Sequence, residues 1–365
     1  MKILLISNYK RGIGGINAQV DLLYTYLNQE YGIKADVFST KGNPLRRCMA
    51  FLKLLCQARR YDILHIHACS YWGMVPAVLG IIAGKLWRKR TIITYHGGGA
   101  EEYFNKRAAF VRRWLSRADE VIVLSGFLKE IFDQHQIHCV VIPNIVVLRP
   151  QTERTTTIAP KFISIRHLEP LYNIPCVLQA YEQVLKQYPE ASLDILGQGS
   201  MRAALEAYVQ EHKLTGVTFV GQVPNDTIYD YFANASIMLS APKIDNMPVS
   251  LLEAMNAGLL VISSRVGGVP YMINEVKGEE NGKADDTLPN RLIASLDRQS
   301  PIANRPNKAT GLLFESDNAD ELAEKMLWAL EHPAEVEQII EQAQTEVQKY
   351  SWNDVKEELF KVYKS

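Results

Sequence analysis

Cysteine is scarce in this sequence, with five residues among 365. Their number is odd and no two of them form a C-x-x-C pair, which argues against both a disulfide framework and a zinc ribbon. We expect reduced and mostly buried thiols at all five positions, Cys48, Cys56, Cys69, Cys139 and Cys176.

A long hydrophobic run is also missing. The most apolar stretch, residues 71–84, contains Pro76, and its fourteen residues fall short of the roughly 20 that span a bilayer. We expect a buried helix there. The apolar run within residues 1–8 is too short for a secretory leader and predicts a buried first strand. A cytoplasmic protein is therefore expected.

Net charge is absent, because 40 Lys and Arg balance 40 Asp and Glu. The balance argues against a nucleic-acid binder that relies on bulk positive charge. The charges are unevenly placed, however. Residues 1–150 carry 21 basic and 10 acidic side chains, a net of +11, and residues 151–365 carry 19 and 30, a net of −11. This asymmetry predicts two halves with different partners.

The length suggests about two domains. Short runs rich in Val and Ile alternate with amphipathic stretches, a pattern typical of parallel strands covered by helices on both faces. Strands are predicted at residues 2–8, 35–39, 63–68, 91–96, 120–125 and 140–143, and again at 161–166, 192–197, 217–221, 236–240, 260–264 and 311–314. Each half is therefore predicted to be a doubly wound α/β domain, with ligands in a cleft beyond the carboxyl ends of the strands.

A polar stretch at residues 149–160 predicts the linker between domains at 1–150 and 151–349. Helices are expected at 318–331, 334–349 and 352–363. Residues 275–308 are polar and weakly periodic, and predict a surface insertion with one helical turn near 291–296.

In the first half, Gly14 and Gly15 belong to a glycine-rich loop that opens a helix, where backbone N–H groups can approach an anion; a tight turn is the alternative. His65 and His67 share one strand face, but two imidazoles without nearby carboxylates or thiols make a poor metal site. His96, followed by three glycines, is predicted to face the cleft and donate to a substrate hydroxyl or phosphate. An incidental turn histidine is the alternative.

In the second half, Arg166 ends a predicted strand, where a guanidinium can hold phosphate oxygens. Gly197 and Gly199 form a G-x-G turn between a strand and a helix. Residues 245–258 carry the strongest pattern. Pro248 suits the first turn of a helix, so the N–H groups of the next three residues predict an anion site.

Two carboxylates accompany that helix. Asp245 precedes it, and Glu253 within it is predicted to accept hydrogen bonds from ribose hydroxyls. The alternative for Glu253 is a capping or solvated carboxylate.

These motifs together resemble the retaining glycosyltransferases of family 4, which have the GT-B fold. The resemblance runs through nearly the whole chain. It implies two Rossmann-like domains facing each other across a cleft, with a closing helix at about 350–365 that returns to the first domain.

The resemblance also implies an activity: transfer of a sugar from a UDP- or GDP-sugar to a glycan or lipid-linked acceptor, in cell-surface polysaccharide or lipopolysaccharide biosynthesis. His96, Asp245 and Arg166 would then be catalytic. No metal or other cofactor is expected, because cations and helix N-termini neutralise the leaving diphosphate. The implied donor-binding residues are Gly14, Gly15, Gly197, Gly199, Asn246, Met247, Pro248, Val249, Ser250, Leu251 and Glu253.

The chain departs from the family pattern at three places. Asp245 stands where the family often has Glu, Tyr172 and Asn173 replace a usual Lys-Gly, and residues 275–308 are an insertion. Arg166 would hold the diphosphate alone or with Lys243 or Arg265. The insertion is interpreted first as a neutral excursion, with a lid or a partner-binding element as alternatives. A degenerate, non-catalytic scaffold and a sugar-nucleotide epimerase are the competing functions.

Much of the positive charge of the first half lies in residues 45–60 and 104–117, two basic amphipathic segments with Phe and Trp. They predict binding to an anionic membrane surface, and hence a peripheral position on the inner face of the cytoplasmic membrane. Packed helices with solvated basic faces are the alternative.

Overall fold

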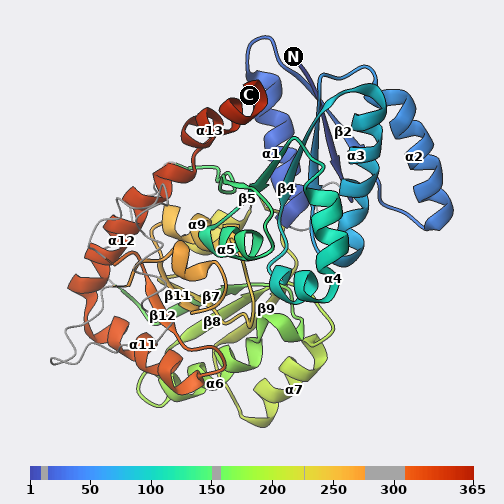
Figure 1. Ribbon diagram of the computed structural model, residues 1–365. Helices are drawn as coiled ribbons and strands as arrows, with labels where there is room; N and C mark the ends of the chain where they lie inside the picture. The colour runs from blue at the N-terminus through green and yellow to red at the C-terminus, as the bar shows by residue number, and fades with distance from the viewer. Residues whose placement is uncertain (10–14, 150–157, 226, 276–308) are drawn as a thin grey trace.

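The computed structural model describes residues 1–9, 15–149, 158–225, 227–275 and 309–365. Two parallel six-stranded sheets form its centre (Figure 1). The first has the order β2-β1-β3-β4-β5-β6. Its strands are β1 (Lys2–Ser7), β2 (Lys34–Ser39), β3 (Ile63–Ala68), β4 (Arg90–Tyr95), β5 (Glu120–Val123) and β6 (Val140–Val141).

The second sheet has the order β12-β11-β10-β7-β8-β9. Its strands are β7 (Lys161–Ile165), β8 (Ser192–Leu196), β9 (Val217–Gly221), β10 (Ile237–Ser240), β11 (Leu260–Ser264) and β12 (Leu312–Phe314). All twelve predicted strands are present, and the α/β fold class is confirmed.

Helices cover both faces of each sheet, which is why β3 is buried along its whole length. Around the first sheet lie α1 (Gly15–Gln29), α2 (Pro44–Ala58), η1 (Tyr71–Met74), α3 (Val75–Trp87), α4 (Ala100–Leu115) and α5 (Gly126–Gln134). Around the second lie η2 (Pro170–Tyr172), α6 (Ile174–Leu185), α7 (Arg202–Glu211), α8 (Ile228–Phe232), α9 (Val249–Asn256), η3 (Val269–Tyr271), α11 (Ala319–Glu331), α12 (Pro333–Val347) and η4 (Gln348–Tyr350).

The last helix, α13 (Trp352–Lys364), returns to the first domain (Figure 1). Ser351 caps its N-terminus by accepting from the N–H of Asp354. Trp352 stacks on Tyr26 and donates to Glu30 of the first domain. The apolar face of α13 shares a core with β1 and α1, so the predicted crossing back is confirmed.

Three expectations need correction. Tyr71 and Trp72 are exposed, because η1 turns them outward before the buried helix α3 begins. The thiols are all free but not mostly buried: Cys48 and Cys56 are exposed, since both lie on the surface helix α2. Phe104 lies on the buried side of α4 and contributes nothing to an exposed basic face.

In the part of the chain that the structure describes, no helix is both long and apolar enough to cross a membrane. Gly14, most of the linker and residues 276–308 of the insertion lie outside the described residues.

Candidate active site

The carboxyl ends of the two sheets meet through the loop between β10 and α9. Ser125 of the first domain donates to the Oδ1 atom of Asn246 over 2.5 Å, and Asn144 donates to the carbonyl of Met247 over 3.2 Å. A Cβ on Gly98 would lie 3.4 Å from the nitrogen of Asn246. Asn246 and Met247, predicted to hold the donor, therefore also join the two domains.

Arg166 lies at the centre of the second domain's half of the site. Its Nε and Nη2 atoms donate to Ser240 Oγ over 3.1 and 3.0 Å, and Nη1 donates to Ser250 Oγ over 3.1 Å. Asp245 forms an ion pair with Nη2 at 3.4 Å. The guanidinium is thereby fixed between the end of β10 and the start of α9, and two of the three predicted catalytic residues are in contact.

The start of α9 differs from the prediction in one detail. Pro248 is the N-cap residue and Val249 begins the helix. The N–H of Leu251 is not free, because it donates to the Pro248 carbonyl over 3.1 Å in a tight first turn. The predicted anion site is thus reduced to the N–H groups of Val249 and Ser250, beside the Arg166 guanidinium.

Glu253 lies one turn further along α9, three residues from Ser250 and so on the same helix face. Burial raises its pKa to about 7, opposed by the nearby charge of Arg149. Its carboxylate makes no hydrogen bond to a described residue, so a capping role does not fit. It is available to accept from a ligand.

Gly197 and Gly199 are needed for close packing of loops. A Cβ on Gly197, whose φ is +142°, would lie 1.9 Å from the Arg166 carbonyl oxygen. One on Gly199 would lie 2.2 Å from the Leu168 carbonyl oxygen. The G-x-G turn therefore sets the end of β7 and, through it, Arg166. Gly15 has open space around it.

The departures from the family pattern have structural consequences. The Tyr172 ring lies 5.8 Å from the Arg166 guanidinium carbon, where it can form a cation–π contact. Asn173 takes the left-handed conformation (φ 50°) that a glycine adopts easily and that Asn tolerates best among other residues. Lys243 pairs with Asp317, and Arg265 pairs with Glu275 and Glu315. Neither cation pairs with Asp245, whereas Arg166 does.

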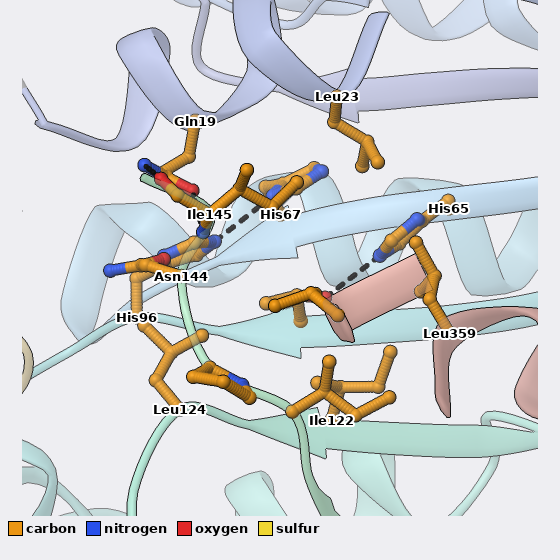
Figure 2. Close-up of a pocket in the computed structure, with 14 residues that line it drawn as sticks. Gln19, Leu23, His65, His67, His96, Ile122, Leu124, Asn144, Ile145 and Leu359 are labelled. Carbon is orange, nitrogen blue, oxygen red and sulfur yellow. Dashed lines mark hydrogen bonds between the residues drawn. The ribbon is translucent and has the colours of Figure 1, made fainter. Parts of the chain in front are cut away.

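In the first domain, His96 follows β4 and lies in a row of three imidazoles (Figure 2). The Nδ1 atom of His67 and the Nε2 atom of His96 are 2.9 Å apart. The His67 ring stacks against His65, with centroids 4.8 Å apart. His65 in turn bonds to Tyr363 of α13 through Nδ1 and to Thr94 through Nε2, both over 2.7 Å.

Burial keeps these imidazoles neutral. It lowers the pKa of His65 to about 3 and that of His96 to about 4, and it lowers the pKa of His67 as well. A cavity of about 40 Å³ runs beside the three rings. Within the described residues, no group of three or more His, Cys, Asp or Glu side chains is arranged to hold a metal ion.

Sequence reasoning missed Ser240, Ser125 and Asn144. Ser240 could have been identified, because it is the last residue of β10 and ligand sites in parallel sheets lie at the carboxyl ends of the strands. Ser125 also ends a predicted strand and caps α5, but neither Ser125 nor Asn144 carries a local sign of a partner in the other domain.

Two family models match the chain. The model for glycosyltransferase family 4 matches residues 13–149, and that for glycosyl transferases group 1 matches residues 151–284. The solved structure of HepE from Anabaena in complex with UDP-glucose superposes with a TM-score of 0.76 at 16% identity, over 100% of this chain and 99% of that one.

The curated relatives are matched over a smaller share of their length. The gpi3 subunit of phosphatidylinositol N-acetylglucosaminyltransferase from Schizosaccharomyces pombe is 27% identical over 229 residues, 62% of this chain and 43% of that protein. The chain thus spans less than half of that relative. N-acetyl-alpha-D-glucosaminyl L-malate synthase from Bacillus anthracis is 24% identical over 294 residues, 72% of this chain and 73% of that protein.

Both domains therefore carry a family match, and the two facing parallel sheets are those of the solved relative. The chain belongs to glycosyltransferase family 4 and has the GT-B fold.

Proposed function

We propose that the protein transfers a sugar, with retention of anomeric configuration, from a UDP- or GDP-sugar to a glycan or lipid-linked acceptor. The observation that carries this proposal is the Arg166 guanidinium, fixed by Ser240 and Ser250 beside the free N–H groups of α9. Guanidinium and helix N–H groups together are a site for a diphosphate. The names of the relatives, which include UDP-glucose and N-acetylglucosamine, support a UDP-sugar first.

In this proposal Glu253 accepts from the ribose hydroxyls and Arg166 stabilises the charge that develops on the leaving diphosphate. The first domain presents the acceptor and contributes His96 from across the cleft. Positive charge comes from the protein, so we propose that transfer needs no metal ion. The leaving phosphate then helps to deprotonate the acceptor hydroxyl on the same face, which accounts for retention.

A thermal-shift panel tests the donor site. UDP, GDP and their glucose, N-acetylglucosamine, galactose and mannose derivatives are added with and without EDTA. A ligand at 100 times its Kd raises stability by about 2.7 kcal/mol, so the true donor should raise the Tm by several degrees in either buffer. Arg166→Gln and Glu253→Gln should abolish most of that shift, whereas Glu206→Gln should keep it, because Glu206 is a half-buried glutamate on α7 that pairs with Arg202 and not with Arg166.

No shift with any nucleotide would contradict the proposal, as would a full shift in Arg166→Gln. Chromatography and NMR of the product then identify the anomer and the acceptor. Release of free nucleotide with an epimerised sugar and no acceptor product would favour the epimerase instead.

We further propose that α2 rests on the inner face of the cytoplasmic membrane. Leu45, Met49 and Leu52 are exposed on α2, and residues 37–61 contain no acidic side chain. Trp72 is 74% exposed. The guanidinium carbon of Arg47 lies 5.2 Å from the centroid of the Trp72 ring. Basic side chains next to an exposed Trp and aliphatic residues suit an anionic lipid surface.

Sedimentation with vesicles checks this surface. Phosphatidylglycerol-containing vesicles should bind the protein at low salt and release it at high salt, while pure phosphatidylcholine vesicles should not bind it. Leu52→Glu should weaken the binding, and Tyr31→Glu, at a fully exposed position outside α2, should not. Absence of salt-sensitive binding would leave α2 as a helix with a solvated basic face.

A further inference from the structure

His67 is the one imidazole of the buried row that bonds directly to His96. The two ring nitrogens lie 2.9 Å apart, and the ring planes, with centroids 5.2 Å apart, are inclined by 25°. His67 is almost wholly buried on β3, whereas His96 lies at the open end of β4 and is half-buried. His67 is thus placed behind His96, away from any ligand in the cleft.

The ring of His67 cannot easily turn. His65 stacks on its other side, and both nitrogens of His65 are held, one by Tyr363 and one by Thr94. Figure 2 shows the rings on neighbouring strands, with the dashed bond from His67 pointing to His96. The backbone positions of β3 and β4 are fixed by six consecutive pairs, so the distance between the two imidazoles is fixed as well.

The other nitrogen of His67 decides the direction of the hydrogen bond. Nε2 is buried and has no partner among the described residues. If His96 were the donor, His67 would carry its proton on Nε2, which would be a buried N–H without an acceptor. Such groups are rarer in proteins than unpaired acceptors, because the desolvated donor costs about 1–3 kcal/mol.

We infer that His67 is a positioning residue that donates from Nδ1 to Nε2 of His96 and so fixes His96 as the neutral tautomer with its proton on Nδ1. His96 then presents an N–H donor toward the cleft in one orientation. The His65–Tyr363 pair holds the His67 ring, so the last helix of the chain supports a residue at the proposed active site. The functional part of this inference rests on the proposed function, but the tautomer does not.

The tautomer can be observed without any substrate. Long-range proton–nitrogen NMR spectra of protein labelled with ¹⁵N-histidine separate protonated from bare ring nitrogens. Comparison with His96→Phe assigns the His96 signals among the eight histidines. We expect a single species with a protonated Nδ1 and a hydrogen-bonded, bare Nε2 in the wild type. A protonated Nε2 in the wild type would overturn the inference.

Two variants separate the hydrogen bond from the packing. His67→Phe keeps the stacked ring and removes the bond, so His96 should become a mixture of tautomers. His67→Asn places its amide near the former Nδ1 position and should restore a single species. His138→Phe, at an exposed histidine, should change nothing. A single unchanged His96 tautomer in His67→Phe would overturn the proposal.

A double-mutant cycle adds the functional readout, with release of nucleotide from the nucleotide sugar that shifts the Tm most. His67→Phe should lower the rate about 10–100-fold, as small misplacements of site groups do. The same change in a His96→Phe background should have no further effect, because His67 acts only through His96. Equal losses in both backgrounds would show a general structural role. If the wild type releases no nucleotide, the proposed function fails while the NMR result still decides the tautomer.

Discussion

At the scale of single residues, the site combines groups with opposite electrostatic needs. Arg166 is surrounded by three oxygen acceptors, from Ser240, Ser250 and Asp245, which stabilise its charge. Glu253 lies in surroundings that disfavour its charge, and its pKa is raised to about 7. In the proposed function, a ribose that donates to this carboxylate would supply the missing stabilisation.

Glu253 predicts a pH dependence of folding stability. Between its ordinary pKa of 4.5 and about 7, the folded state keeps a proton that the unfolded state loses. Stability should therefore fall as pH rises through this window, by up to about 1.4 kcal/mol per pH unit. Glu253→Gln lacks this loss. Denaturant titrations at pH 5 and 8 should show the variant gaining stability relative to the wild type as pH rises.

The buried histidines act in the opposite direction, since their lowered pKa values make stability rise with pH up to about 6.5. They are present in both proteins and cancel in the difference. An equal pH profile for wild type and variant would contradict the raised pKa of Glu253.

Gly197 gives a second residue-scale prediction. Gly197→Ala introduces a Cβ 1.9 Å from the Arg166 carbonyl oxygen at a φ of +142°, and should cost roughly 1–3 kcal/mol of unfolding free energy. Gly15→Ala, where nothing lies within 4 Å, should cost little. Chemical denaturation of both variants checks the contrast, and equal costs would show that the G-x-G turn does not depend on this close approach.

At the scale of elements, the strands and the helix starts follow from local patterns. Continuous Val and Ile runs predicted every strand, because parallel strands covered on both faces leave no polar side to alternate. The exposure of Trp72 was not predictable, since the apolar run from Tyr71 continues into α3 without a break in composition. The bond from Leu251 to Pro248 was equally hidden, because it depends on the backbone angles of one turn.

The contact between α13 and the buried His65 of β3 predicts a change in the free energy of unfolding. Tyr363→Phe removes the hydroxyl that bonds to buried His65 and should cost about 1–3 kcal/mol, because the imidazole nitrogen loses its partner. Tyr24→Phe, at an exposed tyrosine, should cost almost nothing. Urea unfolding measures both. If Tyr363→Phe proved as stable as the control, α13 would be held by its apolar face alone.

At the scale of the whole molecule, the two domains touch through side chains whose partners are more than a hundred residues away in sequence. Such contacts, from Ser125 to Asn246 and from Asn144 to Met247, leave no trace in local periodicity. The sequence motifs predicted Arg166, Asp245 and Glu253 for one half of the candidate site and His96 for the other. They did not predict which residues hold the halves together, because that depends on how the domains are placed.

The contact of Tyr271 with the first domain predicts an effect on the arrangement of the two domains. Its hydroxyl donates to Glu130 of the first domain, and its ring lies against Gly126. Loss of a charge-assisted bond, worth about 1.5–3 kcal/mol, should shift the domains about tenfold or more toward an open arrangement. Small-angle X-ray scattering of ligand-free Tyr271→Phe should therefore give a larger radius of gyration than the wild type.

Tyr208→Phe is the matched control, because Tyr208 also donates to a glutamate, Glu182, but within one domain. Its radius of gyration should match the wild type. The prediction fails if both variants scatter like the wild type.

The return of α13 to the first domain also determines when the core of that domain can be completed during synthesis. Trp352, Leu359 and Tyr363 complete a core whose other members, such as Ile3 and Leu5, leave the ribosome first. All of the second domain is translated between them. The first sheet must therefore wait, with the part of one hydrophobic face that α1 does not cover still exposed, until α13 has been translated. The half of the protein that is made first is the last to be finished.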